Sequence, residues 1–134
     1  MNVFDNNEIE TVHKQYEVEV KERFGKTDAY KEYEQKTADY NKDKWQQVND
    51  GLNAVFLKFA ICMKNGLAPC SDEAQALVKE LQNYITENYY TCHKEILKGL
   101  AKMYVLDERF KNNIDRHADF TAEYVSEAIE IYCK

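Results

Sequence analysis

Apolar residues recur along this chain every three or four positions, which is the spacing of helix faces and not the alternation of strands. Valines and aromatic residues at every fourth position predict a first helix over about residues 5–24. Gly25 then stands where helices commonly end, and Thr27 and Asp28 open a second helix over about residues 28–40 with an aromatic stripe. The chain is therefore expected to begin with two amphipathic helices.

The longest predicted helix covers about residues 42–64, where apolar residues from Trp45 onward keep the spacing of a buried face. Pro69 prevents easy continuation, because proline disfavours helix in itself and in the residue before it. Ser71 or Asp72 then caps a further helix running towards residue 88. We expect Trp45 to lie in the core.

The C-terminal third is predicted to form a helix, a hinge, a short helix and a last helix. The pattern leaves open whether the preceding helix continues through Tyr89 and Tyr90. A helical run follows over about residues 96–104, and Asp107 is expected to cap a short helix. The last helix is predicted over about residues 120–132.

Length and composition favour one domain over residues 1–134. Four glycines and one proline leave few helix breakers, and 44% hydrophobic with 31% charged residues is a folded composition. We expect an all-α, orthogonal or globin-like bundle of about six to eight helices that buries one core without disulfides. The Glu/Lys runs at 17–22 and 31–36 read as solvated helix faces.

Charge and hydropathy exclude several classes of function. A formal net charge of −6 argues against a positively charged surface that would bind the phosphate backbone of a nucleic acid. No apolar stretch approaches the roughly 20 residues of a membrane span, and residues 1–8 lack the pattern of a secretory signal. We therefore expect a cytoplasmic protein that binds neither nucleic acid nor membrane.

The four cysteines and three histidines show no metal or haem spacing, so no cofactor is expected. Four reduced thiols are typical of a cytoplasmic protein. On an apolar helix, Cys62 is expected to belong to the core, whereas Cys133 lies near the terminus and is read as incidental.

Three blocks of sequence carry a resemblance to a known family. They are YEVEVKERFG at 16–25 with TDAY at 27–30, KTADY at 36–40 with KDKW at 42–45, and YTC at 90–92, MYVLDERF at 103–110 and NID at 113–115. In order and spacing they resemble the TipA-like antibiotic-recognition domain of the MerR family of transcription regulators, over about residues 16–132.

The resemblance implies a globin-like ligand domain without haem. In the family this domain is joined to a DNA-binding domain and a dimerising coiled coil, or is produced alone and sequesters drug. The chain shows no DNA-binding region, so DNA is expected to be reached only through a domain that the chain lacks. The best-known ligands are thiopeptide antibiotics, and part of residues 1–30 is expected to be mobile until ligand binds.

The family's covalent chemistry is not expected here. Members that trap thiopeptides covalently carry two cysteines seven residues apart, of which Cys92 matches the first. Gly99 stands where the second, attacking cysteine would be, so thiolate addition at that position is impossible. Cys92 itself is followed by Glu95 and Ile96 at helical spacing, which would raise the pKa of its thiol, and a core or groove-lining role is favoured.

Cys92, Ile96, Gly99 and Met103 stand at i, i+4, i+7 and i+11, so they are expected to share one helix face. A glycine inside a helix costs up to ~1 kcal/mol relative to alanine, which close approach of either a ligand or a neighbouring helix would explain. Tyrosine suits heteroaromatic ligands because it joins an apolar ring to a polar tip. The candidate ligand-binding residues are Tyr33, Tyr40, Tyr89, Tyr90, Cys92, Ile96, Gly99 and Met103.

We therefore expect a noncovalent effector-binding domain for a bulky, drug-like small molecule, without enzymatic activity. One alternative is a helical interaction module that holds a partner peptide or helix in its groove. Another is an enzyme that uses Cys92 covalently, for which the sequence supplies no base.

Overall fold

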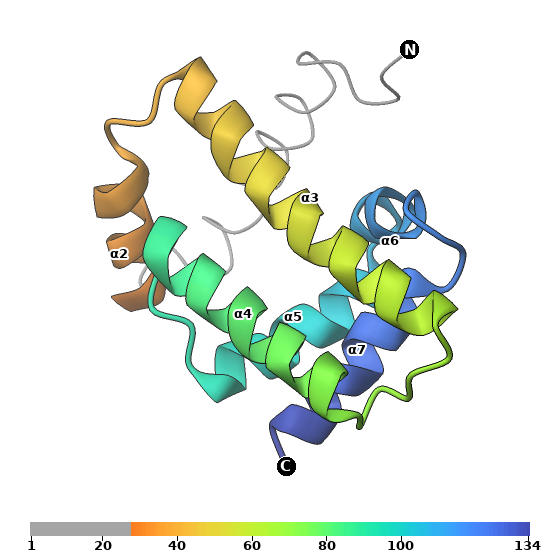
Figure 1. Ribbon diagram of the computed structural model, residues 1–134. Helices are drawn as coiled ribbons and strands as arrows, with labels where there is room; N and C mark the ends of the chain where they lie inside the picture. Colours follow the sequence, from red (N-terminus) through yellow and green to blue (C-terminus); the bar gives the residue numbers. More distant parts are fainter. Residues whose placement is uncertain (1–27) are drawn as a thin grey trace.

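The computed structural model describes residues 28–134, and this part of the chain is built from six α-helices and their connections (Figure 1). The helix predicted over about residues 5–24 lies outside the described residues, as does most of the 1–30 segment. The helices are α2 (Asp28–Thr37), α3 (Lys42–Lys64), α4 (Asp72–Asn88), α5 (Lys94–Leu106), α6 (Glu108–Asp115) and α7 (Thr121–Tyr132).

Local capping chemistry sets most of the helix ends. Asn41 caps α3, Ser71 caps α4 and Asp107 caps α6, each accepting a hydrogen bond from a backbone N–H in the first turn. Gly66 lies in the left-handed region with φ of 78° and turns the chain after α3. The predicted bounds of α3 and the caps at Ser71 and Asp107 are confirmed.

Helix α2 ends at Thr37, three residues before its predicted end. The Tyr40 N–H donates to the Thr37 carbonyl at 3.0 Å in a turn, and Asn41 then starts α3 with its side-chain cap. The shorter helix follows from this capping, because Asn41 has extended backbone angles that cannot continue α2.

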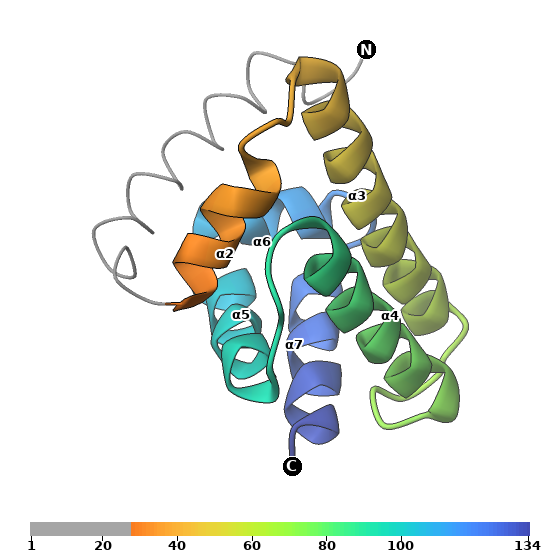
Figure 2. The same ribbon diagram turned by 90° about the vertical axis from the view of Figure 1, so that its left-hand side faces the viewer.

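Helix α7 packs against α3, α4, α5 and α6 and so holds the described bundle together (Figure 1). Burying a large apolar side chain contributes about 1.5–3 kcal/mol each, and this core is rich in them. The largest fully buried apolar side chains are Phe56, Phe59, Leu81, Leu97, Ile114 and Ile129. By contrast, α2 lies outside the closely packed helix pairs, beside the C-terminal end of α4 (Figure 2).

The prediction that one continuous helix face runs through residues 92–103 is wrong. Helix α4 ends at Asn88, and the Tyr90 N–H donates at 3.2 Å to the Ile85 carbonyl, five residues back, instead of making the helical bond to Thr86. Residues 89–93 form a loop, and α5 begins only at Lys94. Cys92 therefore lies before the helix that carries the other three residues of the predicted face.

The cysteines divide by burial. Cys62 lies in the core, which confirms the prediction, and Cys70 is exposed. The interpretation of Cys133 as incidental is wrong, since it is buried with its Sγ 3.6 Å from the Lys94 carbonyl oxygen. Within residues 28–134, no helix combines the length and apolarity needed to cross a membrane.

Candidate functional site

Four aromatic side chains from separate segments meet beside the end of α4. Tyr33 of α2 stacks on Tyr89 of the 89–93 loop, with ring centroids 6.4 Å apart and planes 25° apart. Trp45 of α3 lies 6.3 Å from Tyr89 and meets Tyr40 edge-on at 5.1 Å. We call Tyr33, Tyr40, Trp45 and Tyr89 the aromatic cluster, and it brings together three of the residues predicted for the ligand site.

Polar contacts fix the rings of the aromatic cluster. The Tyr40 hydroxyl donates to the Asn88 carbonyl at 2.7 Å, and the Lys44 Nζ lies 5.4 Å from the Tyr40 ring centroid. Burial of the Tyr89 hydroxyl raises the pKa of that group above its usual range, so it stays protonated. Trp45 was predicted in the core, but it is only half-buried because it packs against this cluster of partly exposed tyrosines.

A carboxylate from α2 holds the loop that carries Tyr89. Glu32 accepts hydrogen bonds from the Thr91 N–H at 2.8 Å and from the Thr91 hydroxyl at 2.7 Å. The backbone hydrogen bond from Thr91 is the main reason that the pKa of Glu32 is lowered, and the Thr91 hydroxyl and nearby Lys36 act in the same direction. The interpretation of residues 31–36 as a purely solvated face is wrong for Glu32 and Lys36.

Cys92 belongs to the core and not to a reactive surface. It is buried, and burial raises the pKa of its thiol to about 12. Its backbone is held as well, since its N–H donates to the Thr86 Oγ1 at 3.1 Å and its carbonyl accepts from the Gln82 Nε2 at 2.8 Å. At neutral pH such a thiol is almost wholly protonated, which makes it a poor nucleophile.

The remaining predicted residues divide between the core and the surface of α5. Tyr90, Ile96 and Met103 are partly buried and pack against the core. Gly99 is exposed, and among residues 28–134 no atom lies within 4 Å of the place where its Cβ would be. Close approach of another helix of residues 28–134 therefore does not explain Gly99, and α5 presents a small residue at this point.

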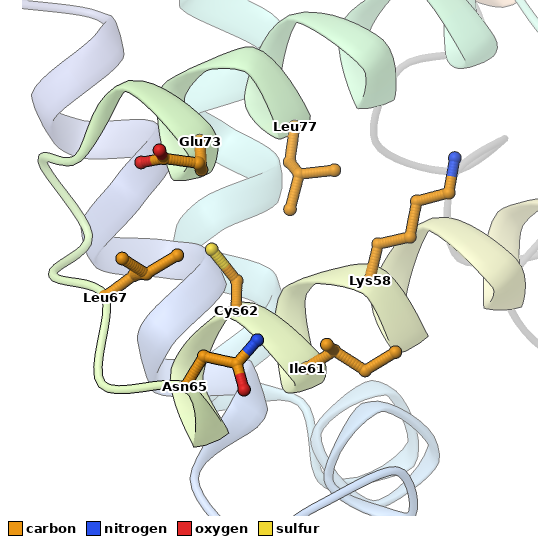
Figure 3. Close-up of a pocket in the computed structure, with 7 residues that line it drawn as sticks. All are labelled: Lys58, Ile61, Cys62, Asn65, Leu67, Glu73 and Leu77. Atoms are coloured by element: carbon orange, nitrogen blue, oxygen red, sulfur yellow. The ribbon is translucent and has the colours of Figure 1, made fainter.

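A hollow of about 290 Å³ lies between the end of α3 and the start of α4 (Figure 3). Its lining is mostly apolar, with the Cys62 side chain directed between Leu67 and Leu77. Leu57 and Ile61 on the same helix are 45% and 49% exposed. The sequence indicated nothing here, because Cys62 and its neighbours follow the ordinary spacing of a core-facing helix.

No group of three or more metal-ligating side chains gathers anywhere in residues 28–134. What the described site presents is aromatic surface beside backbone groups held by hydrogen bonds. Such a surface suits recognition of a large apolar ligand with scattered polar atoms.

Comparison with known proteins points the same way. The chain matches a family described as the TipAS antibiotic-recognition domain over residues 16–132. It is 39% identical over 115 residues to the HTH-type transcriptional activator TipA of Streptomyces coelicolor, covering 86% of this chain and 46% of that protein. It is 33% identical over 126 residues to the HTH-type transcriptional activator mta of Bacillus subtilis, covering 94% of this chain and 48% of that protein.

A solved structure of TipAS from Streptomyces lividans in complex with nosiheptide matches with a TM-score of 0.79 and 36% identity. The match covers 98% of this chain and 87% of that one. It confirms the all-α, globin-like architecture. The chain spans about half the length of the curated relatives it matches.

Proposed function

The chain belongs to the TipAS antibiotic-recognition domain family, as its sequence blocks predicted, and we propose that it binds bulky thiopeptide-type antibiotics without forming a covalent bond. The observation that carries this proposal is the aromatic cluster. It joins rings from α2, α3 and the 89–93 loop, which are far apart in the sequence. The relative of known structure holds nosiheptide, a ligand of this class.

The aromatic rings of the cluster fit the chemistry of such a ligand. Stacked or edge-on ring pairs contribute about 0.5–1.5 kcal/mol beyond their buried area, and large macrocycles offer several rings to one surface. We propose that Tyr33, Tyr40 and Tyr89 contact the ligand, with Trp45 added to the set. Ile96, Gly99 and Met103 would extend the surface along α5, where an open glycine leaves room for a bulky group.

Two observations support noncovalent binding. Gly99 has no sulfur at the position of the family's attacking cysteine. Cys92 is buried, and the pKa of its thiol is raised to about 12, so addition to a dehydroalanine group would be slow. We propose neither a catalytic role nor a cofactor for this domain. Tyr90 and Cys92 would support the site from the core side.

The curated relatives are about twice as long as the matched region and carry HTH in their names. We propose that residues 1–134 form one effector-binding domain, and that DNA is contacted only by a separate domain. In a full-length activator, ligand binding would bias the DNA-bound dimer, whereas the domain alone would sequester drug. A cytoplasmic location follows from this role.

The hollow between α3 and α4 favours a different candidate function. Its apolar lining, with exposed Leu57 and Ile61 alongside, would suit the apolar face of a partner helix. This alternative places the functional surface at the end of α3 and the start of α4, whereas the aromatic cluster lies beside the end of α4. The two candidates therefore differ in which residues respond to the ligand.

One titration separates the candidates. Nosiheptide or thiostrepton would be added to the 134-residue chain, followed by intact-mass spectrometry and amide-proton NMR. Shifts around Tyr33, Trp45 and Tyr89 without added mass are the expected result. A stable adduct on Cys92 would overturn noncovalent recognition. Absence of any shift would reject thiopeptides, and a peptide-groove function at Leu57 and Ile61 would then be favoured.

A further inference from the structure

Helix α2 lies beside the end of α4 and the loop after it (Figure 2). The Lys36 Nζ donates to the Thr86 carbonyl, and Glu32 accepts from Thr91. The tyrosine that follows α2, Tyr40, donates to the Asn88 carbonyl. These contacts join residues about fifty positions apart in the sequence.

Two of these contacts complete α4. The last carbonyls of a helix have no partner within it, and the last turn of α4 contains no basic residue. Lys36 places a positive charge at this end, where the helix dipole favours cations. With the Tyr40 hydroxyl on the Asn88 carbonyl, α2 and the residues after it act as the C-terminal cap of α4.

Glu32 does something different, because it holds the loop and not the helix. Its two carboxylate oxygens take both polar hydrogens of Thr91, the N–H and the hydroxyl, at 2.8 and 2.7 Å. Thr91 lies two residues after Tyr89, whose ring packs against Tyr33 and Trp45. Lys36 is 3.7 Å from the Glu32 Oε2 and orients the carboxylate.

Resting on the proposed function, we propose that Glu32 is a positioning residue of the ligand site. It acts through Thr91 and fixes the backbone of residues 89–93, which presents Tyr89 to the ligand within a preformed aromatic cluster. Hydrogen bonds to a charged acceptor contribute more than neutral ones. Their loss would leave the loop to be ordered at the moment of binding, which weakens affinity.

The test uses the 134-residue chain with Glu32→Ala, Glu32→Gln and the matched control Glu34→Ala. Glu34 is exposed on the same helix, and its replacement changes the net charge equally. Nosiheptide affinity is measured by calorimetry, and Trp45, the only tryptophan of the chain, reports on the aromatic cluster by its fluorescence. Amide exchange in α5 and α7 shows whether the core is intact.

We expect Glu32→Ala to weaken binding about tenfold, with a red shift of Trp45 emission and faster exchange at residues 89–93 before ligand is added. Glu32→Gln, which keeps one acceptor, should recover part of the affinity, and Glu34→Ala should stay within twofold of the unmodified chain. Adding Thr91→Ala to Glu32→Ala should cause little further loss of affinity, because Glu32→Ala has already removed the contact between the two side chains.

Unchanged affinity and unchanged exchange at residues 89–93 in Glu32→Ala would overturn the proposal. So would a loss in Glu34→Ala equal to that in Glu32→Ala, since general charge would then be the cause. If the unmodified chain binds no thiopeptide, the proposed function fails, but Trp45 emission and loop exchange still decide whether Glu32 positions Tyr89.

Discussion

Tyr84 of α4 stands over Gly51 of α3, where its hydroxyl fills the space in which a side chain at position 51 would lie. A Cβ built on Gly51 would come 2.7 Å from the Tyr84 Cζ, far inside van der Waals contact. The same hydroxyl donates to the Val48 carbonyl at 2.7 Å. The absence of a side chain at Gly51 therefore allows α3 and α4 to pack around a rigid ring.

Gly51→Ala should destabilise the protein by a net amount of about 1–2 kcal/mol. Overpacking costs about 1–3 kcal/mol, and the better helix propensity of alanine recovers up to about 1 kcal/mol of that. Urea unfolding followed by circular dichroism would measure the change. A variant as stable as the unmodified chain would show that moving Tyr84 aside costs no more than the helix-propensity gain of alanine.

Gly99→Ala is the matched substitution on α5 and should have the opposite sign. A Cβ at Gly99 would meet no atom of residues 28–134 within 4 Å, so against these residues only the propensity gain remains and unfolding should require up to about 1 kcal/mol more. Nosiheptide affinity should fall if the ligand approaches this glycine closely. Higher stability with unchanged affinity would remove Gly99 from the ligand site.

Phe120→Gly should stabilise the protein by about 0.5–1 kcal/mol, because a left-handed backbone strains any residue with a Cβ. Phe120 has φ of 69° at the start of α7, and its side chain is 66% exposed, so little packing is lost. Phe120→Ala is the control, since it removes the ring and keeps the strain. Equal gains in both variants would show that the exposed ring, and not the backbone, is unfavourable.

The Asp107–Arg109 pair should make stability depend on pH. Arg109 donates to Asp107 at 2.7 Å, and this side-chain hydrogen bonding lowers the pKa of the carboxyl in the folded chain. The contribution is therefore fully present above the unfolded pKa of about 3.9. It is lost as the pH falls through the lower folded pKa.

The variant Asp107→Asn, which keeps an oxygen for the helix cap, tests this dependence. It should lose about 1 kcal/mol at neutral pH, and its difference from the unmodified chain should shrink towards the acid end of the folded range. Glu108→Gln removes the same charge from an exposed neighbour and is the control for net charge. A difference for Asp107→Asn that is constant with pH would contradict the assignment.

Much of the helical architecture follows from neighbouring residues alone. The spacing of apolar residues predicts α3 over residues 42–64, and Ser71 and Asp107 are caps because their oxygens reach N–H groups two or three residues away. The sequence blocks also predicted the family correctly, since ordered motifs survive where single residues change. These features depend on distances of a few residues, which a sequence displays directly.

The site depends on contacts that no local pattern contains. Glu32 and Thr91 are 59 positions apart, and nothing in the spacing of either segment indicates that they meet. The same holds for Tyr33 with Tyr89, and for the loop that removes Cys92 from its predicted helix face. Periodicity states which side of a helix is apolar, whereas packing of several helices decides which loop residue meets which side chain. The sequence alone thus determined the bounds of α3, the caps of α4 and α6 and the family, because each depends on neighbouring residues. Only the tertiary structure decided the aromatic cluster, the burial of the Cys92 thiol and the contact of Glu32 with the 89–93 loop, because these depend on how the helices pack.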